Sequence, residues 1–357
     1  MILLNKLESI TIKVAQERKI RMTYHKTMKY YKEDEQKERI ICSLCRHSCK
    51  LKEGQVGICG VNKNVNGELK TLVYGHPIAV NVDPVEKKPL YHMLPGSRVL
   101  SFGTVGCNFK CSFCQNWDIS QESTVNEEIK VSPEQMVELA LEQGAESIAY
   151  TYNEPTIFYP YAKDIGVIAK EKGLKNIFVS NGFESPEIIE DMASWVDAAN
   201  IDLKSWDDRY YKKSLKGGLE EVKDTLRKMI AAGIWVEVTT LLIEGENDSD
   251  KDLTEMAEFI AQDLGKHVPW HLSAFSPNYK MLDHNATRVE TLNRAKKIGK
   301  QAGLEYIYLG NVVVNGDTHC PECDELLIDR TGYRITGNKL KEGHCPKCDK
   351  VIEGVWK

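Results

Sequence analysis

Residues 107–114 read Cys-Asn-Phe-Lys-Cys-Ser-Phe-Cys, so that the thiols of Cys107, Cys111 and Cys114 share one short segment. Three thiolates on a tight loop can bind three irons of a [4Fe–4S] cluster and leave the fourth iron open to a small molecule. A cluster that only transfers electrons normally has four protein ligands, so the missing fourth cysteine favours a reactive site. The sequence therefore predicts a catalytic iron–sulfur centre at this loop.

Disulfide bonds and zinc are the alternative uses of these three thiols. Three cysteines cannot pair among themselves, and zinc knuckles usually draw on two separated pairs or add a histidine, which this loop lacks. Phe109 and Phe113 can shield a cluster from water, and Gly103 and Gly106 allow a tight turn. The surroundings of the loop therefore favour the cluster.

Short β-branched runs alternate with amphipathic segments over residues 98–311. The predicted strands are 99–104, 146–151, 176–180, 197–203, 234–242, 269–274 and 305–309. The predicted helices are 133–144, 156–173, 186–194, 219–233, 250–263 and 287–302. This alternation predicts an α/β fold in which helices surround a parallel sheet that forms an open or closed barrel. Functional side chains should then lie at the carboxyl ends of the strands.

The composition limits the classes of partner. The chain has 357 residues and a formal net charge of −5, which gives no overall basic field, so nucleic acid is not indicated while small molecules and proteins fit. The sequence shows no 18-residue apolar run and no secretory signal, so we expect a cytoplasmic protein without a membrane partner. Its 11 cysteines fall in three groups, which points to metals rather than disulfides.

The wider segment 101–120, Ser-Phe-Gly-Thr-Val-Gly-Cys-Asn-Phe-Lys-Cys-Ser-Phe-Cys-Gln-Asn-Trp-Asp-Ile-Ser, resembles the radical S-adenosylmethionine (SAM) superfamily. More narrowly it is similar to the AmmeMemoRadiSam-system enzymes, relatives of pyruvate formate-lyase activating enzymes. The resemblance implies a partial (β/α)6 barrel, a [4Fe–4S] cluster on the three cysteines with Phe113 beside it, bound SAM and a one-electron reductant. It further implies that SAM is cleaved to methionine and a 5′-deoxyadenosyl radical, which takes hydrogen from a glycyl-type protein substrate or a small molecule.

The same resemblance assigns a role to the segment after the second predicted strand. In the superfamily a Gly-Gly-Glu segment lies there and receives the amino group of SAM. Here Tyr152-Asn153-Glu154 takes its place, keeping the carboxylate and losing both glycines. Asn153 and Glu154 are therefore expected near SAM. The structural alternative is a glutamate favoured at the start of the helix 156–173 by the helix dipole.

Two further strand ends match positions near SAM in the activating enzymes. Ser180 and Asn181 follow the third predicted strand, and Asp202 and Lys204 end the fourth. Residues two apart on a strand point to the same side, so Asp202 and Lys204 can face one polar ligand, although a structural salt bridge is the competing interpretation. Val179 replaces an aspartate of the activating enzymes, which puts their cation site in doubt here.

The later strands carry three polar residues in apolar surroundings. Glu237 and Thr239 alternate on the predicted strand 234–242 and would face the lumen, where they can line a substrate pocket. His271 can transfer a proton near neutral pH, although a histidine beside Trp270 is more often a barrel-lining residue.

Two C-x2-C pairs, separated by 21 residues, occupy the carboxyl-terminal segment. They are Cys320 with Cys323 and Cys345 with Cys348. Each pair can form a knuckle, and four thiolates close a tetrahedron around zinc, so the pattern predicts a zinc ribbon. A rubredoxin-like single iron takes the same ligands.

The amino-terminal cysteines Cys42, Cys45, Cys49 and Cys59 form a fourfold set within 18 residues. They can bind zinc or an auxiliary cluster with all irons ligated, and His47 could replace one thiol. By ligand type we favour zinc at this structural site.

Four units follow from these patterns. They are a basic helical extension (1–32), a Cys-rich metal-binding segment (33–97), a radical SAM barrel (98–312) and a zinc-ribbon or rubredoxin-like domain (313–357). The leading hypothesis for function is a radical SAM oxidoreductase of the glycyl-radical-activating type. The alternative is a non-catalytic adaptor in which all three cysteine groups are structural.

Overall fold

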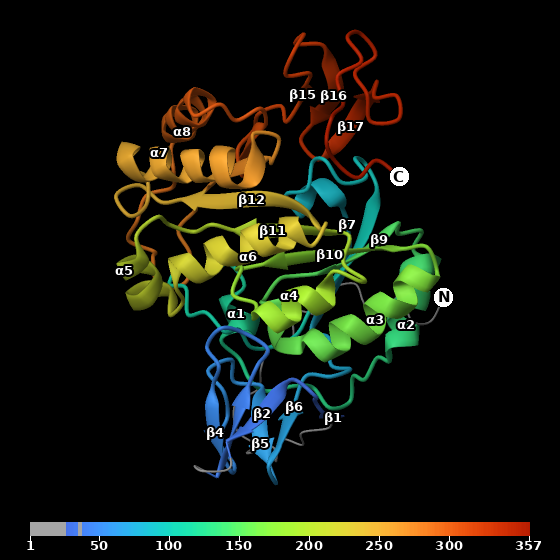
Figure 1. The fold of residues 1–357 in the computed structure, drawn as a ribbon, viewed down its shortest axis with the longest axis vertical. Coiled ribbons are helices and arrows are strands. Elements are labelled where there is room, and N and C mark those ends of the chain that lie inside the picture. Colours follow the sequence, from blue (N-terminus) through green and yellow to red (C-terminus); the bar gives the residue numbers. More distant parts are fainter. Residues whose placement is uncertain (1–25, 35–37) are drawn as a thin grey trace.

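A computed structural model describes residues 26–34 and 38–357 (Figure 1). The helix predicted in the basic extension rests on Leu3, Leu7, Ile10 and Val14, which lie outside the described residues. No helix among the described residues is long and apolar enough to cross a membrane.

The centre of the molecule is an eight-stranded sheet whose spatial order follows the chain from β7 to β14. Its strands are β7 (Ala79–Pro84), β8 (Arg98–Gly103), β9 (Ser147–Tyr150), β10 (Lys175–Ser180), β11 (Ala198–Asp202), β12 (Trp235–Leu242), β13 (Trp270–Ala274) and β14 (Ile307–Gly310). The strands β8 to β14 are parallel, whereas β7 runs antiparallel to β8. All seven predicted strands are confirmed, and the parallel α/β architecture with them. The strand β7, which comes from the Cys-rich segment, was not predicted.

Helices connect successive parallel strands, as the alternation requires. They are α2 (Pro133–Glu142), α3 (Tyr159–Glu171), α4 (Pro186–Met192), α6 (Leu219–Ala231), α7 (Asp250–Phe259) and α8 (Val289–Gln301). The side chains of Ser132, Ser185 and Ser249 cap α2, α4 and α7 by accepting backbone N–H groups of the first turn. The predicted helix 156–173 begins later, at Tyr159, because Pro155–Phe158 form a 3-10 turn. The last turn of the predicted helix 250–263 is a π-helical stretch, Ile260–Gly265.

The side chains of neighbouring residues on a strand point to opposite faces of the sheet. Tyr150 and Phe178 pack on the helices within the main hydrophobic core. Ala149 and Ile177, one position earlier on the same strands, belong to a second cluster that includes Val85, Leu90 and Met93. The segment 85–97 therefore closes the inner face of the sheet near the start of the strands and leaves their carboxyl ends for a site.

Two small units lie at opposite ends of the molecule (Figure 1). The amino-terminal unit contains two three-stranded sheets, one of β2 (Tyr31–Asp34), β3 (Arg39–Cys42) and β4 (Lys50–Lys52), the other of β1 (Lys26–Thr27), β6 (Glu68–Thr71) and β5 (Asn62–Val65). The carboxyl-terminal ribbon contains β15 (Thr318–His319), β16 (Leu326–Thr331) and β17 (Arg334–Asn338). The buried guanidinium of Arg330 joins this ribbon to the inner segment by donating to the carbonyl oxygen of Tyr91 at 2.7 Å.

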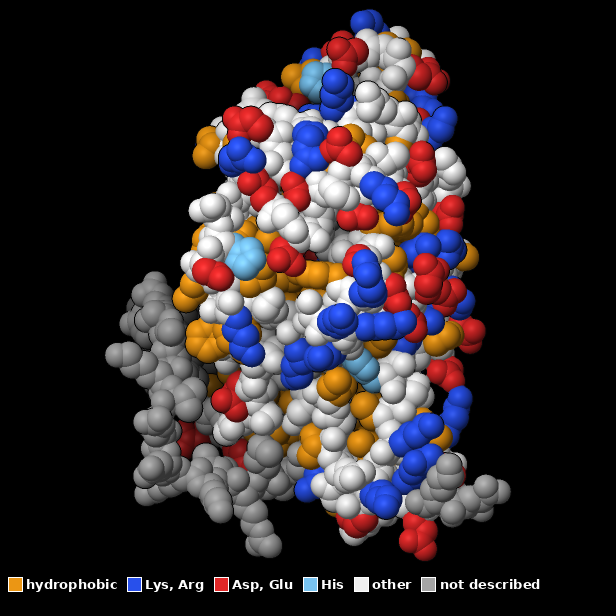
Figure 2. Space-filling model, turned by 90° about the vertical axis from the view of Figure 1, so that its left-hand side faces the viewer, with side chains coloured by type: hydrophobic (Ala, Val, Ile, Leu, Met, Phe, Trp, Pro, Cys, Tyr) orange, Lys and Arg blue, Asp and Glu red, His pale blue; other side chains and the backbone are white. Residues whose placement is uncertain are grey.

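The surface carries basic and acidic side chains interspersed, with apolar side chains between them on the face shown in Figure 2. This mixture agrees with the formal net charge of −5 and offers no broad basic face on this side.

Candidate functional site

The loop with three cysteines leaves the carboxyl end of β8 and ends in the short helix α1 (Trp117–Ser120). Cys111 is buried, and Cys107 and Cys114 are half-buried. The side-chain amide of Asn153 fixes the loop by donating to the carbonyl oxygen of Gly106 at 2.7 Å. Asn153 thus contacts the backbone of the cysteine loop itself, which gives it a positioning contact that the sequence did not reveal.

Aromatic side chains pack beside this loop. Phe109 and Phe113 are both buried, and the ring of Phe109 contacts that of Phe183 with 5.3 Å between centroids. The ammonium of Lys204 lies 5.8 Å from the ring centroid of Phe113. The loop is therefore largely shielded from water, an environment that suits an iron–sulfur cluster.

Glu154 is buried at the carboxyl end of β9, with 2% of its surface exposed. Its carboxylate accepts the backbone N–H groups of Thr156 at 3.0 Å and of Asn181 at 2.8 Å, and the Ser180 hydroxyl at 3.0 Å. Glu154 also caps the 3-10 turn that follows it, so the structural alternative is part of its role. Burial raises the pKa of this carboxyl and outweighs the hydrogen bonds, which lower it.

The backbone before Glu154 adopts a conformation that favours glycine. Tyr152 has φ +68°, the left-handed conformation that glycine adopts without cost. The phenol of Tyr152 accepts a hydrogen bond from Asn81 at 3.0 Å and donates one to Asp83 at 3.2 Å. These contacts with β7 stabilise Tyr152 in its left-handed conformation.

Glu184 is a second buried carboxyl beside Glu154 that sequence reasoning missed. It lies 2.5 Å from the Ser180 hydroxyl, which also contacts Glu154. Burial, followed by the charge of Glu154, raises the pKa of Glu184 to about 8. The Ser180 hydroxyl therefore lies between two buried carboxyls, Glu154 and Glu184. The signal available in the sequence was only a glutamate four residues after Ser180.

Asp202 and Lys204 form an ion pair with 2.7 Å between carboxylate oxygen and Nζ. Burial opposes the charge of Lys204, but Asp202 and then Cys111 outweigh it and raise the pKa of the ammonium. The pair thus lies beside the cysteine loop, on one side of the chain as its spacing predicted. Val179 pairs in register with Asn200 and packs against the inner apolar cluster, so it supplies no carboxylate.

Glu237 and His271 have a structural role in the sheet. Glu237 is fully buried and accepts the backbone N–H groups of Tyr91 and His92 at 2.9 and 2.7 Å, and it contacts His271 Nε2 at 2.6 Å. These contacts anchor the inner segment 85–97. The sequence correctly predicted that Glu237 lies on the inner face of the sheet. It also predicted a substrate pocket there, because nothing in the sequence showed that the segment 85–97 fills the lumen.

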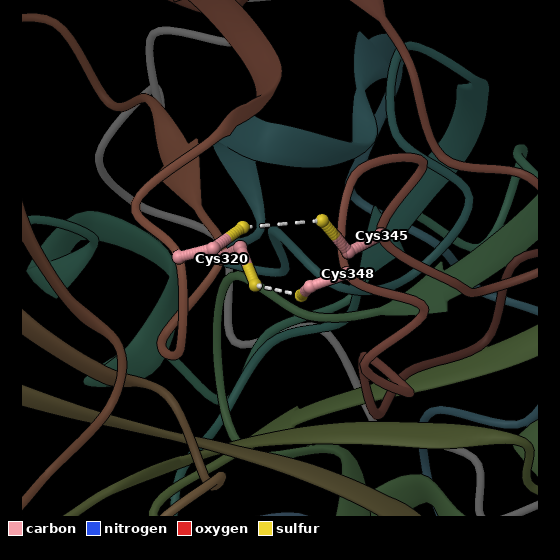
Figure 3. Close-up of side chains that lie close together, drawn as sticks. Cys320, Cys345 and Cys348 are labelled. Atoms are coloured by element: carbon pink, nitrogen blue, oxygen red, sulfur yellow. Dashed lines mark hydrogen bonds between the residues drawn. The ribbon is translucent and has the colours of Figure 1, made fainter.

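The four ribbon cysteines converge on one point (Figure 3). Sγ of Cys320 lies 3.5 Å from that of Cys348, and Sγ of Cys323 lies 3.6 Å from that of Cys345. A tetrahedron of thiolates at a zinc–sulfur distance of about 2.3 Å has edges of roughly 3.8 Å. The four thiols therefore fit a single metal ion.

The two knuckles of the ribbon are built alike. Each reads His-Cys-Pro-x-Cys-Asp, and in each the histidine Nδ1 lies 3.2 Å from the carbonyl oxygen of the final aspartate. The aspartates Asp324 and Asp349 have φ +58° and +62°. This repeat of six residues was present in the sequence and extends the C-x2-C pattern that was used to predict the ribbon.

The amino-terminal quartet, which is Cys42, Cys45, Cys49 and Cys59, lines one cavity beneath β3 and β4. Three of these cysteines are buried and Cys49 is half-buried. The four residues therefore line one cavity, but their sulfurs do not all lie within 4.8 Å of one another as those of the ribbon do.

The chain is similar to one family model and to several known proteins. Residues 102–260 match the model of the Radical SAM superfamily. The uncharacterized protein MJ0808 of Methanocaldococcus jannaschii is 41% identical over 308 residues, 85% of this chain and 90% of that protein. A second protein of this organism, “Putative glycyl-radical enzyme activating enzyme MJ1227”, is 28% identical over 58% of this chain and 85% of its own length.

Solved structures support the fold. The Streptococcus suis protein SuiB, in its crystal structure bound to S-adenosylmethionine, aligns with a TM-score of 0.50 and 12% identity, covering 64% of this chain and 53% of SuiB. At this identity the likeness concerns the fold.

Proposed function

Because this chain belongs to the radical SAM superfamily, we propose that it cleaves SAM at the Cys107–Cys114 loop and abstracts hydrogen from a glycyl residue of a protein substrate. The observation that carries the proposal is the meeting of three groups at the strand ends. The three thiols come from the loop after β8, Glu154 from the end of β9, and the Asp202–Lys204 pair from the end of β11.

The thiols of Cys107, Cys111 and Cys114 would bind three irons of a [4Fe–4S] cluster. When reduced by one electron, such a cluster supplies the reductive cleavage of the SAM sulfonium, which yields methionine and a 5′-deoxyadenosyl radical. Asn153 holds the loop that carries the first thiol, and Phe109 and Phe113 keep water from it.

Glu154 and the Asp202–Lys204 pair are suited to the polar part of SAM. Glu154 has its carboxylate oriented by Ser180 and by the backbone of Asn181, which suits it to accept an ammonium group. The Lys204 ammonium, 2.7 Å from Asp202, is suited to a carboxylate. The two charged groups together match a ligand that carries both an amino and a carboxylate group.

The preference for a glycyl-type substrate rests on the relative named as an activating enzyme, which this chain covers over 85% of its length. Candidate proteins deuterated at glycine test this preference. Deuterium recovered in 5′-deoxyadenosine identifies a protein substrate. Deuterium transfer from small molecules alone would replace the protein with a small-molecule substrate.

Electron paramagnetic resonance (EPR) of the reconstituted, reduced protein tests the open iron. Addition of SAM should change the spectrum of the reduced cluster in the unaltered chain and in the control variant Cys348→Ala, which removes a thiol of the ribbon and none of the loop. The variant Cys111→Ala should lose this response. A SAM response that persists in Cys111→Ala would contradict the assignment of the loop.

A further inference from the structure

The amino-terminal quartet, which is Cys42, Cys45, Cys49 and Cys59, differs from the ribbon in the spacing of its sulfurs. Among the described residues, the ribbon cysteines are the group whose ligand atoms all lie within 4.8 Å of one another, and the amino-terminal quartet does not meet this condition. A single zinc ion needs such close sulfurs, since all four thiolates bind the same atom. In a [4Fe–4S] cluster each thiolate binds a different iron, so the sulfurs stand farther apart.

We propose that the amino-terminal quartet binds a second [4Fe–4S] cluster, with all four irons ligated, that passes electrons to the cluster of the Cys107–Cys114 loop. The binding of the second cluster stands on the quartet alone. Its role as a relay rests on the proposed function.

The cavity between the four thiols has the character of a cluster site. It is lined, besides the thiols and Gly57, by Leu44, Leu51, Ile58, Asn62 and Ile157. The four thiols would supply the metal ligands. The other residues that line the cavity are mostly apolar. Apolar walls are typical of iron–sulfur sites, where they limit access of water.

Gly57 keeps part of this space free. A Cβ atom at Gly57 would lie 3.6 Å from Sγ of Cys49 and 3.7 Å from Sγ of Cys59. The two sulfurs therefore face the same side of Gly57, and a side chain there would enter the space between them. The loop 54–60 thus supplies both an open wall and the fourth thiol.

The segment that holds Cys59 packs against the loop after β8. A Cβ atom at Gly106 would lie 2.7 Å from the carbonyl oxygen of Cys59 and 3.1 Å from Cδ1 of Ile157, which itself lines the quartet's cavity. Gly106 directly precedes Cys107. On the other side of the quartet, His47 Nε2 contacts the carbonyl oxygen of Asn108 at 2.9 Å. The two cysteine groups are thus joined by direct packing.

The opposite side of the quartet faces solvent through the loop that holds Gly57. Val56 and Ile58 are 41% and 38% exposed, although both are apolar. An exposed apolar loop over a cluster suits the docking of an electron donor. In this scheme, one electron from a low-potential donor reduces the second cluster and then passes to the first cluster. The second cluster returns to its oxidised form, and no bond is made or broken at it.

The variant Cys107→Ala/Cys111→Ala/Cys114→Ala tests the second cluster in the full chain. After anaerobic reconstitution we expect about four irons and one zinc per chain, with a reducible cluster whose EPR spectrum does not respond to SAM. Two zincs with no cluster would overturn the proposal. This test does not involve SAM cleavage, so a failure of the proposed function would leave its result unaffected.

Cys42→Ala/Cys49→Ala tests the relay in a chain that keeps the three loop cysteines, because the two quartet thiols that remain cannot hold a cluster. With reduced flavodoxin as donor, formation of 5′-deoxyadenosine should lose most of its rate, while the SAM response of the first cluster and the rate with dithionite remain. An equal rate with flavodoxin would overturn the relay. If Cys42→Ala/Cys49→Ala does not fold, Val56→Asp on the exposed loop replaces it: loss of the flavodoxin-driven rate alone supports the relay, and an unchanged rate contradicts it.

Discussion

At the scale of single residues, Glu154 is the side chain that we propose receives the amino group of SAM. Glu154→Ala removes the acceptor of Ser180, Thr156 and the Asn181 backbone, and each buried donor left without a partner costs about 1–3 kcal/mol. We therefore expect weaker SAM binding together with lower stability, while the cluster still assembles. Isothermal titration with SAM and iron analysis measure the two effects.

Glu142 offers a matched control for this substitution, because it is an exposed glutamate at the end of α2. Glu142→Ala should leave SAM affinity unchanged. Equal affinity in Glu154→Ala and the unaltered chain would return Glu154 to a purely structural role at the start of the 3-10 turn.

Glu184 makes stability depend on pH in an unusual direction. Its folded pKa is raised to about 8 from the ordinary value of 4.5, so the folded state holds a proton that the unfolded state has lost between these values. The free energy of unfolding should then fall as the pH rises from about 5 to 8, by at most about 1.4 kcal/mol per pH unit. Urea unfolding of Glu184→Gln should show a flatter profile over this range. A profile parallel to that of the unaltered chain would show that Glu184 is ionised in the folded state.

At the scale of elements, helix α3 depends on a close contact that only glycine allows. A Cβ atom at Gly166 would lie 2.1 Å from the Trp195 ring. Gly166→Ala should therefore destabilise the protein by about 1–3 kcal/mol through overpacking, despite the better helix propensity of alanine. Thermal unfolding measures this loss. Val167→Ala, at an exposed position on the same helix, should change stability little, and a similar loss in both variants would contradict the packing argument.

The ribbon should depend on one zinc ion. With sulfurs 3.5 and 3.6 Å apart in pairs, the four thiols need a bound cation to stay close when they ionise. We expect Cys348→Ala to lose one zinc per chain and to lower the unfolding temperature, because β16 also carries Arg330, which holds Tyr91 of the inner segment. Metal analysis that finds iron in this site would identify a rubredoxin-like centre.

At the scale of the whole molecule, the sequence predicted what depends on local patterns. The parallel strands and their helices follow from periodicity, and the loop 107–114 and the ribbon follow from cysteine spacing. The sequence analysis did not predict β7. This strand is an antiparallel edge strand, and it lies in the segment 33–97, which was interpreted from its cysteines alone. Glu237 on β12 acts through contacts with the distant segment 85–97. Glu184 acts through Ser180, which contacts Glu154 in the segment after β9. Contacts between distant segments leave no local pattern in the sequence.

Reductive cleavage of SAM tests the central claim most directly, because the adaptor hypothesis and the enzyme hypothesis both accept the metal sites. The reconstituted chain, given a strong one-electron reductant under anaerobic conditions, should form 5′-deoxyadenosine and methionine even without its own substrate. The variant Cys107→Ala/Cys111→Ala/Cys114→Ala should form none. Absence of reductant-dependent 5′-deoxyadenosine from a fully reconstituted sample that binds SAM would contradict the account.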